Sequence, residues 1–520
     1  MASRSSSVVA GWVVTVWFLG ALAAAGMPAA DLLIRNARVV DGTGAAAVVA
    51  DVRIRGDRIA EVAPRLEPLP GEELRDARGL VLAPGFIDVH SHAERGLLAD
   101  PDAASQTRQG ITTMLVGQDG ESAWPLADWF ARLDATPLAV NVATMVGHAT
   151  VRAQVMGRGL FRAARPEEID AMKRIVAAEM AAGAFGLSSG LEYEQAHFST
   201  TEEVIELAKV AGAAGGSYIS HVRDEGPRVF EAFDELMRIG REAKLPVQIT
   251  HIKLGTPSTW GLAAKRMPAY FERAAREGID LRADVYPYTY WHSTIRVLVT
   301  DRDFFNPAKV AAGLANNGGA ENIRLARYTP DPRLAGKTIP EIAAFWGVSD
   351  IDAYMRLVRE TMGELVGGGE MESIIGTSMS EEDVRWFVAH PQVGFCSDGE
   401  LRGAHPRGAG TFPRILGRFV REQGALSLEA AVHKMTGLAA ARLGLADRGR
   451  IAPGMVADLV LFDPATVLDN ATIEDPGAPP TGILAVMNAG EWVVDGGKPT
   501  GKRPGKALRM SPRGAPGTQP

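Results

Sequence analysis

Histidines and an aspartate stand at the ends of four predicted strands, where they could hold a metal ion. His90 and His92 are two residues apart in FIDVHSH, so their side chains point to the same face of a strand. His221 ends GSYISH, His251 ends PVQITH, and Asp398 ends VGFCSD. Imidazole nitrogens and carboxylate oxygens suit zinc and related divalent ions. If the strand ends meet, these five residues predict a metal centre of one or two ions.

The elements between these residues predict a barrel that brings the strand ends together. Short apolar runs alternate with helical stretches such as PEEIDAMKRIVAAEMAAG and TEEVIELAKVAGAAG. The predicted strands are FIDVHSH, GITTMLVG, LAVNVATMVG, AFGLSSG, GSYISHV, PVQITHI, LRADVYPY and VGFCSDG. Eight strands with helices between most of them indicate the α/β class and a (β/α)8 TIM-like barrel, whose strand ends line its mouth. An open doubly wound sheet is the alternative, but no GxGxxG follows the first strand to support it.

The two ends of the chain predict a separate β-rich module. Residues 31–84 have the pattern of short strands with turns, and the same pattern returns at 445–500. We therefore expect a small composite β-sandwich module, with the hydrolase barrel at 85–444 between its two parts. Residues 300–375 interrupt the alternation of predicted strands and helices with mixed helices and the Gly-rich patch at 367–369. This indicates an insertion on a barrel loop. Residues 501–520 are basic and rich in Pro and Gly, which predicts a flexible tail.

The first 30 residues have the pattern of a targeting segment and not of a part of the folded domains. An apolar run from Val8 to Ala25 follows Arg4, and the small residues Ala29 and Ala30 come next. This pattern is typical of a secretory signal peptide. The run is also long enough to span a membrane as an uncleaved anchor. We expect an exported protein, periplasmic or secreted, that is membrane-anchored if the segment is not cleaved.

Composition narrows the classes of function. The 520 residues are 46% hydrophobic and 22% charged, which excludes wholesale disorder. The net charge of −7 argues against a nucleic-acid partner. Cys396 is the single cysteine of the chain, so neither an intrachain disulfide nor a Cys-rich zinc module can form. We interpret Cys396 as a buried strand residue.

The ordered motifs GFIDVHSH, ISHVRDEG, ITHIKLG and FCSDG resemble the amidohydrolase superfamily. GHATVR, GLSSGLEY, DVYPYT, HPRGAGTFPR and GRIAPGMVADLVLFDP are similar to its N-acyl-D-amino-acid deacylase (D-aminoacylase) branch. The resemblance covers roughly residues 31–500. It implies a hydrolase that uses Zn²⁺, or another divalent metal, to cleave the amide bond of a small-molecule N-acyl-D-amino acid or small peptide.

The resemblance also assigns roles by position. It implies that His90 and His92 hold one ion and that His221 and His251 hold the other. Asp398 would be both a ligand and the catalytic proton shuttle. A metal ion lowers the pKa of bound water and polarises the scissile carbonyl. Asp398 would then take the proton from the attacking water and return it to the leaving amine.

One loop departs from the pattern of the branch. The branch usually has a metal-bridging cysteine in a GNCG loop after the second strand, whereas this loop reads GQDG with Asp119 in its place. Other branches bridge with a carboxylated lysine on the fourth strand, but AFGLSSGLEY contains no lysine and ends near Glu192. A carboxylate oxygen can replace sulfur at zinc. We expect Asp119 or Glu192 to complete the metal site, with a small preference for Glu192 because its longer side chain can reach in from a loop.

Polar residues just beyond the strand ends are candidates for holding the substrate. Lys253 follows the His251 strand and could meet a carboxylate, although a solvated loop lysine is an equal interpretation. Arg407, in HPRG, could lie over the pocket. His292 does not stand at the end of a predicted strand, so the sequence assigns it no role. The residues that follow or end the DVYPY strand could donate hydrogen bonds to the substrate, namely Tyr286, Tyr288 and Ser293.

Three other functions stay open from the sequence. A cyclic-amide hydrolase, such as a hydantoinase or dihydroorotase, would belong to the same superfamily, but its expected fourth-strand lysine is absent. A dipeptidase that acts on D-residues is the second alternative. The third and most remote alternative is an exported binding protein without catalytic activity. Such a protein would be expected to have lost metal ligands, whereas the ligand set is nearly complete here.

Overall fold

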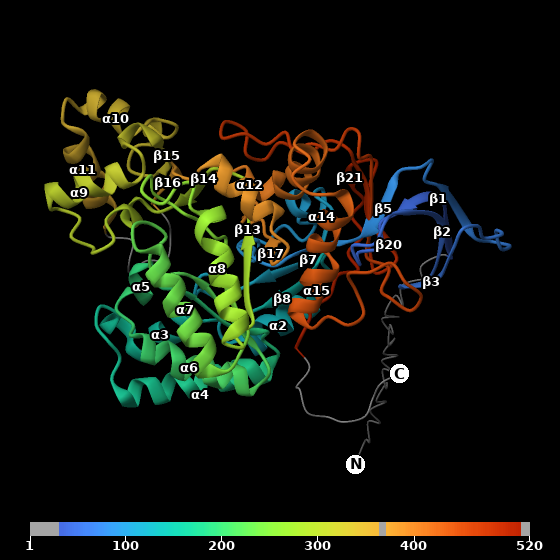
Figure 1. Ribbon diagram of the computed structural model, residues 1–520, viewed down its shortest axis with the longest axis horizontal. Helices are drawn as coiled ribbons and strands as arrows, with labels where there is room; N and C mark the ends of the chain where they lie inside the picture. The colour runs from blue at the N-terminus through green and yellow to red at the C-terminus, as the bar shows by residue number, and fades with distance from the viewer. Residues whose placement is uncertain (1–30, 363–370, 511–520) are drawn as a thin grey trace, which may run out of the picture.

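The computed structural model describes residues 31–362 and 371–510, and its centre is a barrel of parallel strands (Figure 1). One sheet has the order β6-β7-β8, and a second has the order β17-β13-β12-β11-β10-β9. Only Met145 separates β8 from β9, so the chain itself links the two sheets. The strands are β6 (Phe86–Asp88), β7 (Ile111–Val116), β8 (Asn141–Thr144), β9 (Val146–Gly147), β10 (Gly186–Gly190), β11 (Ser217–His221), β12 (Val247–Ile249), β13 (Leu281–Val285) and β17 (Val393–Phe395).

Backbone hydrogen bonds just beyond the strand ends bring β6 next to β17. Asp398 N donates to His90 O over 2.9 Å, and His92 N donates to Gly399 O over 2.9 Å. Asp88 Oδ1 also accepts a hydrogen bond of 2.8 Å from Ser397 N. The predicted strands are therefore confirmed in parallel order around the barrel, with β8 and β9 together forming one of them.

Helices between the strands cover the barrel with apolar faces. In α7 the buried side chains recur at helical spacing, as in Phe230, Phe233 and Met237. Helix α6 starts after Thr200, whose side chain accepts a hydrogen bond from Glu203 N and caps the helix. The helices of this layer are α1 (Ala104–Thr107), α2 (Leu126–Ala135), α3 (His148–Met156), α4 (Pro166–Ala182), α5 (Glu194–His197), α6 (Thr201–Ala213), α7 (Val229–Ala243), α8 (Ala263–Arg276), α12 (Glu381–Ala389), α13 (Arg407–Arg414), α14 (Leu428–Met435) and α15 (Gly437–Leu443).

Within the described residues, strands from both ends of the chain form one nine-stranded sheet, where a sandwich was expected. Its path is β21-β20-β19-β18-β5-β1-β2-β3, and β4 pairs with β1. The two parts meet where Leu82 of β5 pairs with Leu461 of β18, and both residues are buried in the module's own apolar core. The strands are β1 (Leu32–Val39), β2 (Val48–Arg55), β3 (Arg58–Ala63), β4 (Glu73–Asp76), β5 (Val81–Pro84), β18 (Leu459–Phe462), β19 (Ile483–Asn488), β20 (Glu491–Asp495) and β21 (Lys498–Pro499).

An inserted segment follows β13 and lies on the other side of the barrel from the β-module (Figure 1). Its described residues form a small antiparallel sheet of order β14-β16-β15 and three α-helices. Its first strand starts at Tyr290, ten residues before the predicted insertion, and the predicted Gly-rich patch at 367–369 lies outside the described residues. The elements are β14 (Tyr290–Ser293), α9 (Pro307–Asn316), β15 (Ile323–Tyr328), α10 (Ile339–Trp346), α11 (Asp350–Thr361) and β16 (Glu372–Thr377).

The prediction of a flexible tail is wrong for residues 501–510. Gly505 N donates to Leu138 O over 2.7 Å, and Leu508 N donates to Val142 O over 2.7 Å. Leu508 and Met510 pack on an apolar cluster formed by barrel residues. A Cβ on Gly505 would lie 2.1 Å from a backbone oxygen, so this close approach requires glycine. Composition suggested a frayed end, whereas backbone pairing and apolar contacts hold the segment in place.

The predicted targeting segment at 1–30 and the last part of the predicted tail, 511–520, lie outside the described residues. No helix in the described ranges is both long enough and apolar enough to span a bilayer.

Candidate metal centre

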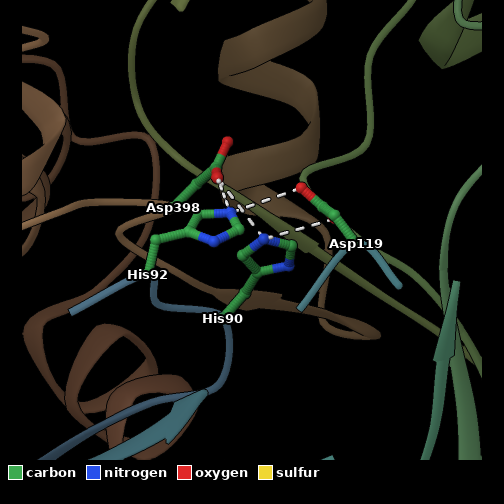
Figure 2. Close-up of side chains that lie close together, drawn as sticks. All are labelled: His90, His92, Asp119 and Asp398. Atoms are coloured by element: carbon green, nitrogen blue, oxygen red, sulfur yellow. Dashed lines mark ion pairs between the residues drawn. The ribbon is translucent and has the colours of Figure 1, made fainter. Parts of the chain in front are cut away.

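Two strand ends and the loop after β7 bring four potential ligands together at the mouth of the barrel (Figure 2). Asp398 Oδ1 lies 3.3 Å from Nε2 of both His90 and His92. Asp119 faces the same two rings, with Oδ1 3.6 Å from His90 Nε2 and Oδ2 3.3 Å from His92 Nε2. All four residues are buried or nearly so. The predicted pairing of the two histidines with Asp398 is therefore present in the geometry, and Asp119 joins them.

Asp119 also belongs to a second group of potential ligands. Its Oδ1 lies 3.4 Å from His251 Nε2, and His251 Nε2 lies 3.2 Å from His221 Nδ1. Ligand atoms of the three residues all lie within 4.8 Å of one another. Asp119 is therefore shared by the two groups, as a residue that links two ions would be.

Three of these residues have backbone conformations that are uncommon for non-glycine residues. The φ angles are 54° at Asp119, 35° at His251 and 48° at Asp398. Such strain is found mainly where a functional site needs a particular side-chain direction. Gly120 shares the left-handed conformation with Asp119, and a Cβ there would lie 3.0 Å from Gly190 N. The Asp-Gly turn therefore does not compete with a ligand role, because the turn aims the carboxylate at the imidazoles.

The buried carboxylates create a field that favours a cation. Burial would raise the pKa of Asp119, but the neighbouring imidazoles hold that pKa well below its usual range. Burial likewise opposes the charge of Asp398, whereas Arg407 and the histidines lower its pKa. Burial would lower the pKa values of the two histidines, but the two aspartates outweigh it. They raise the pKa of His90 well above its usual range and that of His92 to about 9. Both carboxylates are thus ionised near neutral pH.

The donor set fits zinc. Both ring nitrogens of His90, Nδ1 of His92 and Oδ1 of Asp119 are buried and have no hydrogen-bond partner in the described part of the chain. Buried polar atoms without partners are rare in folded proteins and call for a missing ligand. Imidazole nitrogens with carboxylate oxygens are a donor set that zinc accepts, and related divalent ions share it.

Glu192 occupies a different place from the one we preferred for it. Its Oε2 lies 2.8 Å from His221 Nε2, whereas the other ring nitrogen of His221 faces His251. Glu192 therefore contacts the side of the His221 ring that points away from His251. Its potential ligand group contains only His221 and Glu225. Asp119 is the carboxylate that faces both histidine pairs, whereas Glu192 stays a potential ligand beside His221.

Glu225 is a site residue that the sequence reasoning missed. Its Oε1 lies 3.2 Å from His251 Nδ1 and 2.9 Å from Lys253 Nζ, and its Oε2 lies 3.9 Å from His221 Nε2. A carboxylate on the outer nitrogen of a ligating imidazole fixes the orientation of the ring. Its position within ISHVRDEG, four residues after His221, was the available signal.

Three of the predicted substrate-binding residues lie together beside the metal centre. Lys253 is buried, and its Nζ contacts His251 Nδ1 at 2.6 Å as well as Glu225. Arg407 Nη1 pairs with Asp398 Oδ2 at 2.5 Å. The ring of Tyr286 lies 4.8 Å from the Arg407 guanidinium and 5.5 Å from Lys253 Nζ. Lys253 and Arg407 also line the cavity over the centre, whereas Tyr286 is buried behind them.

A cavity of about 710 Å³ opens over the metal centre. Its walls come from the barrel mouth and from the inserted segment, and they include the predicted Ser293 as well as Lys253 and Arg407. Tyr288 is not part of these walls, because its hydroxyl donates to Asp469 over 3.3 Å in a buried contact. The expectation that Tyr288 holds the substrate is therefore not supported: its apolar ring packs in the core and its polar end is already satisfied.

His292 also lines this cavity, although the sequence offered no context for it. It lies on β14, so its place depends on how the inserted segment folds over the barrel. Cys396 is buried, and burial raises the pKa of its thiol, in agreement with the interpretation as a strand residue.

Comparisons with known proteins agree with this geometry. A model of the amidohydrolase family matches residues 73–293 and 309–494. A D-aminoacylase of Alcaligenes xylosoxydans xylosoxydans is 38% identical over 506 residues, which cover 92% of this chain and 97% of that protein. An N-acyl-D-glutamate deacylase of the same organism is 36% identical over 512 residues, which cover 94% of this chain and 98% of that protein.

A solved structure is similar over the same length. It is an N-acyl-D-glutamate deacylase of Bordetella bronchiseptica, in complex with zinc and a phosphonate inhibitor that mimics the tetrahedral intermediate. The two chains share 34% identity with a TM-score of 0.82, and the match covers 92% of this chain and 99% of that one.

Proposed function

Because the chain belongs to the amidohydrolase family, we propose that it is a metal-dependent deacylase that hydrolyses N-acyl-D-amino acids to a carboxylic acid and a D-amino acid. The observation that carries the proposal is the position of Asp119 between two histidine pairs, one of which also contacts Asp398. Extensive similarity to D-aminoacylase and to N-acyl-D-glutamate deacylase supports this substrate class.

Each residue of the centre has a role in this proposal. His90 and His92 would hold one Zn²⁺ with Asp398, His221 and His251 would hold a second, and Asp119 would serve both groups. Bound zinc supplies Lewis acidity, which polarises the amide carbonyl and acidifies a water molecule. Asp398 accepts the proton of the attacking water and passes it to the amide nitrogen, because an amine cannot leave unprotonated.

The surrounding residues orient these groups. Glu225 fixes the ring of His251 through Nδ1, and Glu192 fixes the ring of His221 through Nε2. Lys253, Arg407 and Tyr286 stand on one side of the centre, where two cations can neutralise a substrate carboxylate. Ser293 contributes a hydroxyl from the cavity wall.

A substrate panel with metal analysis tests the proposal. N-acetyl-D-amino acids with apolar and acidic side chains should be hydrolysed, whereas the L-enantiomers, a hydantoin and a D-residue dipeptide should react slowly or not at all. Chelation should abolish the activity and added zinc should restore it. Full turnover in demonstrably metal-free protein, or a preference for the cyclic amide, would contradict the proposal.

We also propose that the protein is exported. The support is the charged residue, apolar run and small residues at the start of the chain. Amino-terminal sequencing of the protein from the producing cell should find cleavage after the small residues near Ala25 or Ala30. Recovery of the intact chain in the membrane fraction would support the anchored form, and recovery of the intact chain among cytosolic proteins would overturn export.

A further inference from the structure

His292 projects from the inserted segment toward the metal centre. It lies on β14, where it pairs with Ile375 of β16, so the small sheet fixes its backbone. Its side chain lines both the main cavity and an adjoining pocket of about 20 Å³. The same two spaces are lined by residues of the metal centre and its rim, namely His92, Asp398, Glu400 and Arg407.

The Nε2 atom of His292 is buried and has no hydrogen-bond partner within residues 31–362 and 371–510. The neighbouring His405 differs, because its Nε2 lies 2.9 Å from Tyr290 O and its Nδ1 accepts a hydrogen bond of 3.0 Å from Arg407 N. A buried polar atom without a partner is unfavourable unless something else binds it. The walls of the cavity therefore leave one hydrogen-bonding position for a ligand at His292.

Charge restricts what that ligand can be. Burial first, and then the charge of Arg407, lower the pKa of His292 to about 4. The ring is therefore neutral near pH 7, and one of its nitrogens carries a hydrogen that can be donated. Arg407 and Arg327 act on His292 electrostatically, as do the carboxylates of Glu400 and Asp398, and all four residues line the same cavity. A neutral imidazole that donates its N–H needs an oxygen that accepts, such as that of a carboxylate.

We propose that His292 donates a hydrogen bond from Nε2 to a carboxylate of the substrate and so contributes to substrate affinity. This inference rests on the proposed function, since every N-acyl-amino acid carries an α-carboxylate and an acidic substrate carries a second one. His292 acts in binding and moves no proton in the reaction. It is a specificity residue that the insertion, and not the barrel, supplies.

Three variants separate the hydrogen bond from the shape of the ring. The amide nitrogen of glutamine can take the place of Nε2, whereas that of asparagine lies nearer the place of Nδ1. Steady-state rates of the zinc-loaded wild type and of His292→Gln, His292→Asn and His292→Ala are measured with N-acetyl-D-leucine and N-acetyl-D-glutamate. Metal content is measured in parallel, because His292 shares a pocket with two proposed ligands.

We expect KM to rise roughly 10- to 100-fold in His292→Ala and His292→Asn, with kcat nearly unchanged, since a hydrogen bond to a charged group is lost. His292→Gln should stay close to the wild type. A rise in KM with both substrates assigns the bond to the α-carboxylate, and a rise with N-acetyl-D-glutamate alone assigns it to the side chain.

Unchanged KM in His292→Ala with both substrates would overturn the inference, and so would loss of metal or a fall in kcat alone. Rescue by asparagine instead of glutamine would overturn the role of Nε2. A wild type that hydrolyses neither substrate contradicts the proposed function, which is a separate result.

Discussion

Asp119 has two oxygens at the position where the resemblance implied a single cysteine sulfur. Oδ1 faces His90 and His251, and Oδ2 faces His92. One carboxylate thus faces both histidine pairs, and Oδ1 alone lies near a member of each. A carboxylate is also a harder ligand than a thiolate, which shifts the metal preference of the centre away from the softest ions.

Variants at Asp119 should test this link. Asp119→Ala should lose metal and activity together, whereas Asp119→Cys should retain metal, because a thiolate is also a zinc ligand. Glu192→Gln serves as the comparison and should keep its metal, since Glu192 lies 2.8 Å from the ring nitrogen of His221 that does not face His251. Metal content by atomic emission measures all three variants. A metal content in Asp119→Ala equal to that of the wild type would show that Asp119 is not needed to hold the ions.

Asp398→Asn should remove nearly all turnover while the fold and part of the metal remain. Asparagine keeps an oxygen for a ligand but cannot carry the proton between water and amine. We expect kcat to fall by about 10²–10⁴-fold with little change in KM. Rates measured with metal content normalised check this, and a variant within about tenfold of the wild type would refute the proton-transfer role.

Much of the centre could be predicted because its residues end strands. His90, His92 and Asp398 lie just beyond the carboxyl ends of β6 and β17, so their convergence at the barrel mouth follows from the predicted strand order. Glu225 and His292 could not be found in this way, because their places depend on a loop path and on an inserted sheet. The choice between Asp119 and Glu192 also needed the three-dimensional positions of both histidine pairs.

At the scale of elements, a buried ion pair joins α3 to α6. Arg152 Nη1 lies 2.5 Å from both carboxylate oxygens of Glu203, and His148 Nε2 lies 2.8 Å from Glu203 Oε1. Arg152 also donates from Nε to Gln195 O over 3.1 Å, and Gln195 lines the cavity. The pair therefore ties two barrel helices to one wall of the site.

This network predicts a loss of stability in acid. Burial would raise the pKa of Glu203, but His148 and Arg152 lower it to about 2, below the 4.5 of an unperturbed glutamate. Because the pKa is depressed in the folded state, the stabilisation is complete above about pH 4.5 and is lost as the pH falls toward 2. It amounts to about 3 kcal/mol near neutral pH.

Glu203→Gln is the variant that checks this. It leaves Arg152 buried without its counter-charge, so the free energy of unfolding at pH 7 should fall by about 3–5 kcal/mol. Between pH 4.5 and 2 its stability should depend less on pH than that of the wild type. Urea unfolding of chelated protein measures both profiles without the contribution of metal, and parallel profiles would contradict the assignment.

The barrel elements could be predicted from their patterns, whereas the C-terminal segment could not. The strand GSYISH and the helix from Thr201 have local signals that agree with their tertiary positions. Residues 501–510 have the composition of a loop, and only tertiary contacts decide that Leu508 is packed. Charge and Pro/Gly content are properties of the segment itself and say nothing about the barrel surface on which the segment packs.

At the scale of the whole molecule, this segment ties the end of the chain to the barrel. A chain that ends at Thr500 should be less stable than one that ends at Met510, by about 2–4 kcal/mol, because Leu508 and Met510 lose their apolar contacts. Arg503→Ala with Arg509→Ala is the control and should change stability by less than about 1 kcal/mol, since both ion pairs are exposed. Thermal unfolding compares the three proteins, and equal stability of the two truncated chains would show that the packing contributes nothing.

The nine-stranded sheet has a consequence for the timing of synthesis. Strand β5 is made roughly 375 residues before its partner β18, which at about 5–20 residues per second is a delay on the order of 20–75 s. During that delay, the edge of β5 that later pairs with β18 has no partner from its own sheet. An open strand edge is a template for pairing with other chains. The barrel can begin to form while the ribosome is still working, but the β-module can close only when nearly the whole chain has been made.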